Sequence, residues 1–103
     1  MKENEIQSQI VKYFRSIGYL VFRMNAGRGR NNQWLAPAGT PDLLLIFPKG
    51  QIWLEVKKPG AKLTEAQEQM MVKLKRMGQV FGIVHSLQEA IKFIEIYEKD
   101  KEK

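Results

Sequence analysis

The stretch from Gly39 to Lys57 constrains the fold of this chain more than any other. It contains two apolar runs, Leu43–Phe47 and Ile52–Val56, on either side of Pro48, Lys49 and Gly50. Proline at the second position and glycine at the fourth position of Phe47-Pro48-Lys49-Gly50 favour a type I turn. We therefore predict a β-hairpin with a four-residue loop, and the loop length also fixes the register of its two strands.

The predicted register brings charged side chains together at one end of the hairpin. It sets Leu44 opposite Trp53 and, one step along the same face, Asp42 opposite Glu55. Because side chains alternate along a strand, Lys57 lies on the same face as Glu55 and Trp53. Two carboxylates and one ammonium are thus expected at the ends of two strands that are otherwise apolar.

Two adjacent carboxylates repel each other unless a proton or a cation lies between them. Charged groups are also rarely buried without a partner, because their desolvation is costly. A hard divalent cation such as Mg²⁺, which prefers oxygen ligands, would satisfy both Asp42 and Glu55. The alternative is an Asp at a turn, with Glu55 and Lys57 on the wet face of a half-exposed sheet. For the three residues in this register we favour the metal site.

Composition limits the class of protein. A chain of 103 residues fits one small domain, and its 44% apolar and 27% charged residues are typical of a soluble globular protein. The absence of cysteine excludes a disulfide scaffold, a thiolate nucleophile and a zinc–cysteine site. The first residues do not resemble a signal peptide, and no apolar run is long enough to span a membrane. We therefore expect an intracellular, cytoplasmic protein.

The positive charge is concentrated in one part of the chain. The net charge is +6, and no acidic residue occurs from Ile6 to Pro41. Such a one-signed cluster indicates a polyanionic partner, most simply nucleic acid. An acidic membrane surface fits less well, since no predicted helix combines a basic face with a large apolar one. The basic residues of this span are Lys12, Arg15, Arg23, Arg28 and Arg30.

Residues 26–38 are predicted to form a basic, glycine-rich loop. Its arginine and amide side chains suit contact with phosphates and with an unstacked base, whereas for Trp34 we favour packing on the core. An ordinary solvated loop is the alternative. A second basic turn follows the hairpin at 58–62. The candidate DNA-contacting residues are Arg23, Arg28, Arg30, Lys58 and Lys62.

Hydrophobic periodicity and capping signals predict the other elements. Helices are expected over 3–17, 64–77 and 86–98, and further strands over 19–25 and 79–84. Thr64-x-x-Gln67 and Ser86-x-x-Glu89 have the spacing of capping boxes. The predicted order α-β-β-β-α-β-α indicates one domain over 1–98, a mixed sheet flanked by helices, with a charged tail over 99–103. The predicted core stripe of the second helix is Ala66, Met70, Leu74 and Met77.

Two helical residues are candidates to join the charged cluster. Glu3 lies on the inward stripe with Ile6, whereas Glu5 points elsewhere, although a helix dipole alone also favours an acid at this position. Gln67 shares a face with Leu74 and can lean towards the hairpin, and its capping role explains it equally well.

Pro41-Asp42, twelve intervening residues and then Glu55-Val56-Lys57 resemble the PD-(D/E)xK signature of a large nuclease superfamily. Within that superfamily the chain looks most like the VRR-Nuc (virus-type replication-repair nuclease) family. The resemblance covers roughly residues 3–94 and includes Glu3 followed by Ile6-Gln7, the Gly-Thr-Pro-Asp turn and Gln67. It implies a restriction-endonuclease-like αβββαβ core with a mixed central sheet and an extra C-terminal helix.

The resemblance also implies a set of catalytic roles. Asp42 and Glu55 would hold Mg²⁺ or Mn²⁺, with the Val56 carbonyl as a further ligand and Glu3 acting directly or through water. Lys57 would orient the attacking water and stabilise the developing charge, and the start of the second helix would contribute Gln67.

Stand-alone members of the family resemble four-way-junction resolvases that act as homodimers. The resemblance therefore implies a metal-dependent, structure-specific DNA endonuclease, most concretely a homodimeric Holliday-junction resolvase of repair or recombination. Two-fold symmetry supports this, since paired cuts on two strands call for two related sites. The alternatives are a flap, nicking or restriction-type nuclease, and a non-catalytic basic nucleic-acid-binding module in which Asp42, Glu55 and Lys57 are surface residues.

Overall fold

The computed structural model describes residues 1–24 and 36–102, and the predicted loop over 26–38 falls mostly outside them. The elements in chain order are α1 (Glu3–Ser16), β1 (Leu20–Arg23), β2 (Leu43–Phe47), β3 (Gly50–Val56), α2 (Glu65–Arg76), β4 (Phe81–Val84) and α3 (Leu87–Lys101). This is the predicted order α-β-β-β-α-β-α, and the predicted mixed α/β fold is confirmed. Among the described helices, none combines the length and apolarity that crossing a membrane requires.

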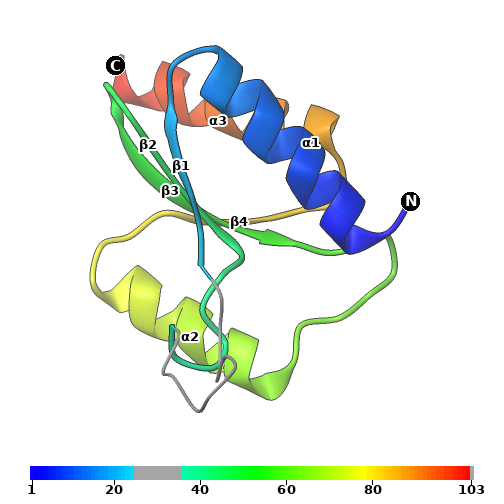
Figure 1. Ribbon diagram of the computed structural model, residues 1–103. Helices are drawn as coiled ribbons and strands as arrows, with labels where there is room; N and C mark the ends of the chain where they lie inside the picture. The colour runs from blue at the N-terminus through cyan, green and yellow to red at the C-terminus, as the bar shows by residue number, and fades with distance from the viewer. Residues whose placement is uncertain (25–35, 103) are drawn as a thin grey trace.

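The four strands form one sheet in the order β1-β2-β3-β4. β1 and β2 are antiparallel, as are β2 and β3, whereas β3 and β4 are parallel. This parallel pair needs a crossover, and α2 supplies it. Figure 1 shows that α1 and α3 cover one face of the sheet and that α2 lies on the other.

The hairpin has the predicted register but a shorter loop. Leu44 lies opposite Trp53, as expected. Phe47 and Gly50 also pair with each other, so only Pro48 and Lys49 lie between the strands, and the prediction of a four-residue loop was wrong. The register is unchanged because both loops bring the same strand positions together. Backbone pairing simply continues one residue further into the turn.

We call the sheet face under α1 and α3 the inner face and the opposite one the α2 face. Buried apolar side chains of the inner face are between 0% and 6% exposed, and with buried residues of the two helices they form the core. Phe14, Tyr19 and Phe47 extend this core as stacked rings, with centroid distances of 5.4 and 4.8 Å. The buried strand residues of the inner face are Val21, Leu43, Leu45, Phe47, Ile52, Leu54, Val56 and Val84, and exposed Arg23 at the end of β1 lies on the same face.

Helix α2 begins as predicted but is less buried than predicted. Its capping box is complete, since the Gln67 N–H donates to Thr64 Oγ1 at 3.2 Å and Gln67 Oε1 accepts from the Thr64 N–H at 2.9 Å. No side chain of α2 is fully buried, however, and Met77 is 78% exposed. The predicted core stripe was therefore wrong at Met77. The helix ends at Arg76, so Met77 no longer follows the helical period.

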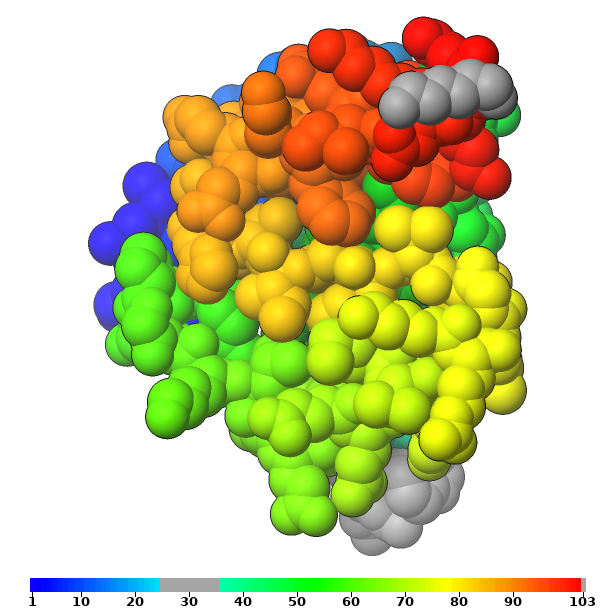
Figure 2. All heavy atoms as spheres, turned by 180° about the vertical axis from the view of Figure 1, so that it is seen from behind, coloured from blue at the N-terminus to red at the C-terminus, as the bar shows by residue number. Residues whose placement is uncertain are grey.

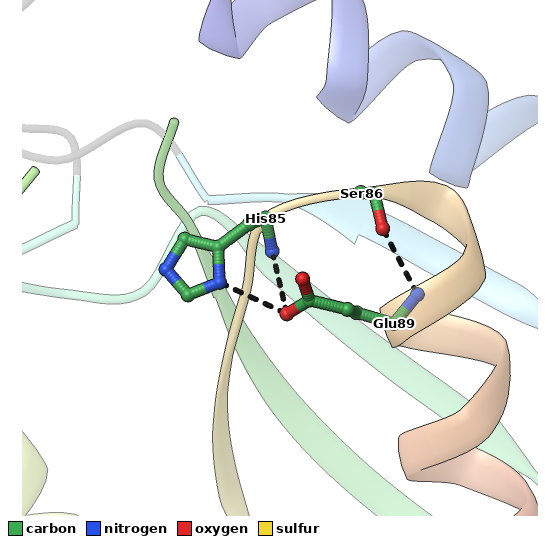
Figure 3. A network of polar contacts seen from close by, with 3 residues as sticks. All are labelled: His85, Ser86 and Glu89. Carbon is green, nitrogen blue, oxygen red and sulfur yellow. Dashed lines mark hydrogen bonds and ion pairs between the residues drawn. The ribbon is translucent and has the colours of Figure 1, made fainter. Parts of the chain in front are cut away.

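Helix α3 starts with a partner that the capping prediction did not include (Figure 3). The Ser86 hydroxyl accepts from the Glu89 N–H at 3.1 Å, as a cap does. Glu89 Oε1 instead contacts the preceding residue, at 3.3 Å from the His85 backbone nitrogen and 2.9 Å from its Nδ1. The helix continues to Lys101, into the predicted tail, and Glu102 pairs with Lys49.

Candidate active site

Asp42 connects the ends of three strands. It directly precedes β2, and its Oδ2 accepts a hydrogen bond from the Val56 N–H at 2.8 Å. Its own carbonyl accepts from the Met24 N–H, just after β1, also at 2.8 Å. A backbone donor at the end of β3 thus fixes one carboxylate oxygen, which places the Asp42 side chain against the neighbouring strand rather than in solvent.

Glu55 lies in β3 on the α2 face and is only 2% exposed. Its Oε2 accepts a hydrogen bond from Gln67 Nε2 at 3.4 Å, so the first turn of α2 reaches the strand. Its Oε1 is buried and has no hydrogen-bond partner among residues 1–24 and 36–102. Leaving a buried oxygen of this kind without a partner costs free energy, which makes it the place where a ligand is expected.

The surroundings of Glu55 oppose its ionisation. Burial is the main cause, and contact with the Asp42 carboxyl adds to it, so that the pKa of Glu55 rises to about 9. The Lys57 ammonium lowers the pKa and Glu3 raises it slightly. Without a cation, Glu55 therefore keeps a proton at neutral pH. The pair needs one positive charge between its oxygens, as two adjacent carboxylates do in general.

Lys57 follows β3 directly and is 9% exposed. Its N–H donates to the Val84 carbonyl at 3.0 Å, which extends the parallel pairing with β4 by one residue. Within the described part of the chain its ammonium forms no ion pair, although it acts electrostatically on Glu55. Lys57 thus supplies positive charge beside the carboxylates without being fixed to either of them.

The structure separates the two carboxylates at the start of α1. Glu3 is half-buried and its Oε2 accepts from the Lys58 N–H at 3.2 Å, next to Lys57. Glu5 is exposed, and its Oε1 accepts from the Lys2 N–H at 3.3 Å in its own helix terminus. Glu3 is therefore the helical carboxylate that lies at the site.

The oxygens at the site fit a hard divalent cation. One oxygen of Asp42 and one of Glu55 are used in hydrogen bonds, and Glu55 Oε1 is left without a partner in the described residues. Carboxylate oxygens are the donors that Mg²⁺ and Mn²⁺ prefer. No group of three or more His, Cys, Asp or Glu side chains that could hold a metal occurs within 1–24 and 36–102. The Asp42–Glu55 pair is thus the candidate donor set.

The candidate DNA-contacting residues are only partly described. Arg23 is exposed at the end of β1, and its Nη2 donates to Ser8 Oγ at 3.2 Å. Arg28 and Arg30 lie outside the described residues. Lys58 and Lys62 are exposed in the connection between β3 and α2, which Figure 2 shows in green on the surface next to α2. Lys58 therefore lies two residues beyond the end of β3, and Lys62 lies further along the same connection.

Sequence reasoning missed the groups that hold Asp42 in place. The Val56 N–H was not among the expected contacts, although an Asp placed just before a strand can accept from the neighbouring strand. Thr40 is 8% exposed, and its N–H and Oγ1 bind the Pro37 carbonyl at 3.1 and 2.6 Å. The Thr-Pro pair before Asp42 was the available signal, because Ser and Thr hydroxyls often close such turns.

A pair of carboxylates, one of them buried, with an adjacent lysine at the end of a mixed sheet between helices is the arrangement of a nuclease fold. The VRR-NUC domain model matches residues 2–88, and the chain belongs to this nuclease family. A solved structure described as a VRR_NUC domain is 27% identical with a TM-score of 0.70, and the match covers 92% of this chain and 96% of that one.

A second solved structure, described as a VRR_NUC domain protein, shares the fold. It is 18% identical with a TM-score of 0.67, and the match covers 96% of this chain and 89% of that one. No curated protein matches the sequence significantly.

Proposed function

We propose that this protein is a metal-dependent DNA endonuclease that cuts branched DNA, most specifically a homodimeric Holliday-junction resolvase. The observation that carries the proposal is the Asp42–Glu55 pair, in which buried Glu55 has a carboxylate oxygen that lacks a partner among the described residues and a lysine lies beside it. A non-catalytic DNA-binding module has no need for a carboxylate that is 2% exposed and faces a second one.

Asp42 and Glu55 would hold Mg²⁺ or Mn²⁺, with the Val56 carbonyl as a further ligand. When bound, the ion would activate water and neutralise charge on the scissile phosphate. Gln67 keeps Glu55 in one orientation through the bond to Oε2, and the Val56 N–H does the same for Asp42. Because both side chains are held in advance, little reorganisation is needed when the substrate arrives.

Lys57 would orient the attacking water and stabilise negative charge that develops on the phosphate. Its freedom from ion pairs in the described part of the chain supports this role, since a lysine fixed to a carboxylate would be less available to a substrate. Glu3 would act at the edge of the site, directly or through water. The exposed Lys58 and Lys62 would bind the DNA backbone.

The homodimer is proposed because two symmetric cuts need two sites related by a two-fold axis. Exposed apolar side chains on the edge strand β1 support it: Leu20 is 58% exposed and Phe22 is 46% exposed. Such surface is typical of places where chains associate. Light scattering should then give the mass of two chains, and a monomer at micromolar concentration would contradict the dimer.

The test is cleavage of a synthetic four-way junction next to linear duplex, flap and splayed-arm DNA, with Mg²⁺, Mn²⁺ or EDTA. We expect paired symmetric cuts on the junction, lost in EDTA and in Asp42→Asn. Asp100→Asn, the same chemical change at an exposed residue of α3, is the control and should cut like wild type.

Each other outcome excludes part of the proposal. Equal cutting of all substrates would keep the nuclease and remove junction specificity. Cutting of flaps or single nicks would favour the flap or nicking enzyme. Tight binding without cleavage in any metal would favour the binding module.

A further inference from the structure

The turn before Asp42 contains a glycine in a conformation that other residues rarely adopt. Gly39 has φ +86°, in the left-handed region. It lies inside the turn that Thr40 closes onto Pro37, and buried Pro41 connects this turn to Asp42. The position of Gly39 therefore determines how the chain enters the active site.

Gly39 also lies directly against the first turn of α2. A Cβ atom at this position would be 2.2 Å from the Ala66 oxygen, 2.5 Å from the Ala66 carbonyl carbon and 3.0 Å from the Gln67 nitrogen. All three are backbone atoms, so no side-chain rotation can relieve the contact. The helix can approach the Asp42 turn this closely only because residue 39 has no side chain.

That approach places Gln67 within reach of Glu55. The Gln67 side chain has two tasks, since its Oε1 accepts from the Thr64 N–H at 2.9 Å and its Nε2 donates to Glu55 Oε2 at 3.4 Å. The second bond is already long, so a small outward shift of the first turn would break it. The capping box moves with the helix and would remain intact.

We propose that Gly39 is a positioning residue, which acts through Gln67 to orient the Glu55 carboxylate. The consequence for metal binding rests on the proposed function, whereas the structural link between Gly39, Gln67 and Glu55 does not. This contact fixes the turn before Asp42 against α2, whose Gln67 binds Glu55 of β3.

The chain offers a matched control for the backbone strain. Gly78 has φ +77°, and within the described part of the chain a Cβ at this position would meet no other atom closer than 4 Å. Gly78→Ala thus introduces a similar left-handed strain without the contact. Gly78 lies after the far end of α2, away from the site. A difference between Gly39→Ala and Gly78→Ala therefore reports the close approach.

The first measurement is the NMR signal of the Gln67 side-chain amide in metal-free protein. In Gly39→Ala we expect it to move to its position in Glu55→Ala, where the acceptor is absent, and in Gly78→Ala to stay as in wild type. An unmoved signal in folded Gly39→Ala, or an equal shift in Gly78→Ala, would overturn the proposal.

Wild-type protein provides a test that does not depend on the folding of Gly39→Ala. Nuclear Overhauser contacts are expected between the Gly39 α-protons and the Gln67 backbone amide, and their absence would also overturn the proposal. For the link to metal binding, Gly39→Ala and Gln67→Ala should each weaken Mn²⁺ binding by about tenfold, the lower end for outer-shell partners. The double variant should lose no more than either single one, and additive losses would contradict action through Gln67.

If the amide signals behave as expected but no DNA is cut, the positioning role stands and the proposed nuclease function fails. If DNA is cut but the amide signals do not move, the nuclease stands and the role of Gly39 fails.

Discussion

The two faces of the sheet are formed by the same largely apolar strands, but helices cover them to different extents. On β2, the inner-face residue Leu45 is 0% exposed, whereas its neighbour Leu44 on the α2 face is only half-buried. On the α2 face Ile83, the partner of Glu55 in β4, is 39% exposed. Two helices cover the inner face and one covers part of the other (Figure 1).

The inner face therefore contributes mainly to stability, whereas the α2 face carries the candidate active site. Along the described strands, the only charged residue of the inner face is Arg23 at the end of β1, whose Nη2 donates to Ser8 Oγ of α1. The apolar residues of this face contribute to the core. The α2 face carries Asp42, Glu55 and Lys57 at one end, beside the first turn of α2. We therefore expect changes on the inner face to reduce stability and changes at the end of the α2 face to reduce activity.

The largest expected effect on the α2 face is the loss of activity in Lys57→Ala. Removing an ammonium that stabilises transition-state charge should lower the cleavage rate by about 10²–10³-fold, with DNA affinity and thermal stability close to wild type. Cleavage and binding assays with Lys75→Ala, an exposed lysine of α2, as the control would measure this. Parallel losses of binding and cleavage would argue against the assigned role.

The next prediction compares Leu45→Ala with Leu44→Ala, which remove the same atoms from the two faces. Leu45→Ala leaves a cavity in the core and should cost about 3 kcal/mol of unfolding free energy. Leu44→Ala should cost about half as much, because its side chain is only partly removed from water. Urea unfolding of both variants provides the measurement. Equal losses would show that the α2 face is as well covered as the inner face.

Leu44 and Leu45 also show why the sequence predicts the order of the elements better than it predicts the burial of individual side chains. The run Leu43–Phe47 is apolar throughout, so its composition does not distinguish the two faces. Turn and capping residues were sufficient for the element order and the register, because these signals are local. The exposure of Met77 and the partial cover by α2 depend on where helices pack, which no local pattern specifies.

The candidate site could be predicted from the sequence to a similar extent. Asp42, Glu55 and Lys57 follow from register and alternation alone, since the period of a strand is regular. Helical periodicity favoured Glu3 over Glu5, and the structure adds the contact by which the Glu3 carboxylate accepts from the Lys58 N–H. The contact of the Val56 N–H with Asp42 was also beyond the sequence, since it joins a side chain to a backbone donor on another strand.

The pH dependence of stability should show the cost of placing Glu55 on this face. Folded metal-free protein holds the Glu55 proton up to a pKa of about 9, whereas the ordinary value is 4.5. Between these values folding takes up a proton, so stability falls as pH rises, by up to about 1.4 kcal/mol per pH unit. Glu55→Gln has no proton to lose and should remove this slope.

Thermal unfolding of wild type and Glu55→Gln from pH 5 to 8 in EDTA would measure the difference in stability between the two proteins. Titrating groups that behave alike in both proteins do not contribute to this difference. Mg²⁺ should stabilise wild type more at pH 8 than at pH 5, because it competes with the proton. Parallel pH profiles of the two proteins would mean that Glu55 is ionised in the folded state without metal.

The smallest expected effect concerns the lysines beside the end of β3. If Lys58 and Lys62 contact phosphates, their double replacement by alanine should reduce the log–log salt slope of DNA binding by about 1.8, or about 0.9 for each contact. Lys92→Ala with Lys99→Ala removes the same charge from exposed positions of α3, on the other side of the sheet, and should leave the slope close to wild type. Equal slopes in the two double variants would mean that DNA binding depends on the net charge of the protein and not on lysines at the α2 side. The functional difference between the two faces would then rest on the carboxylates and Lys57 alone.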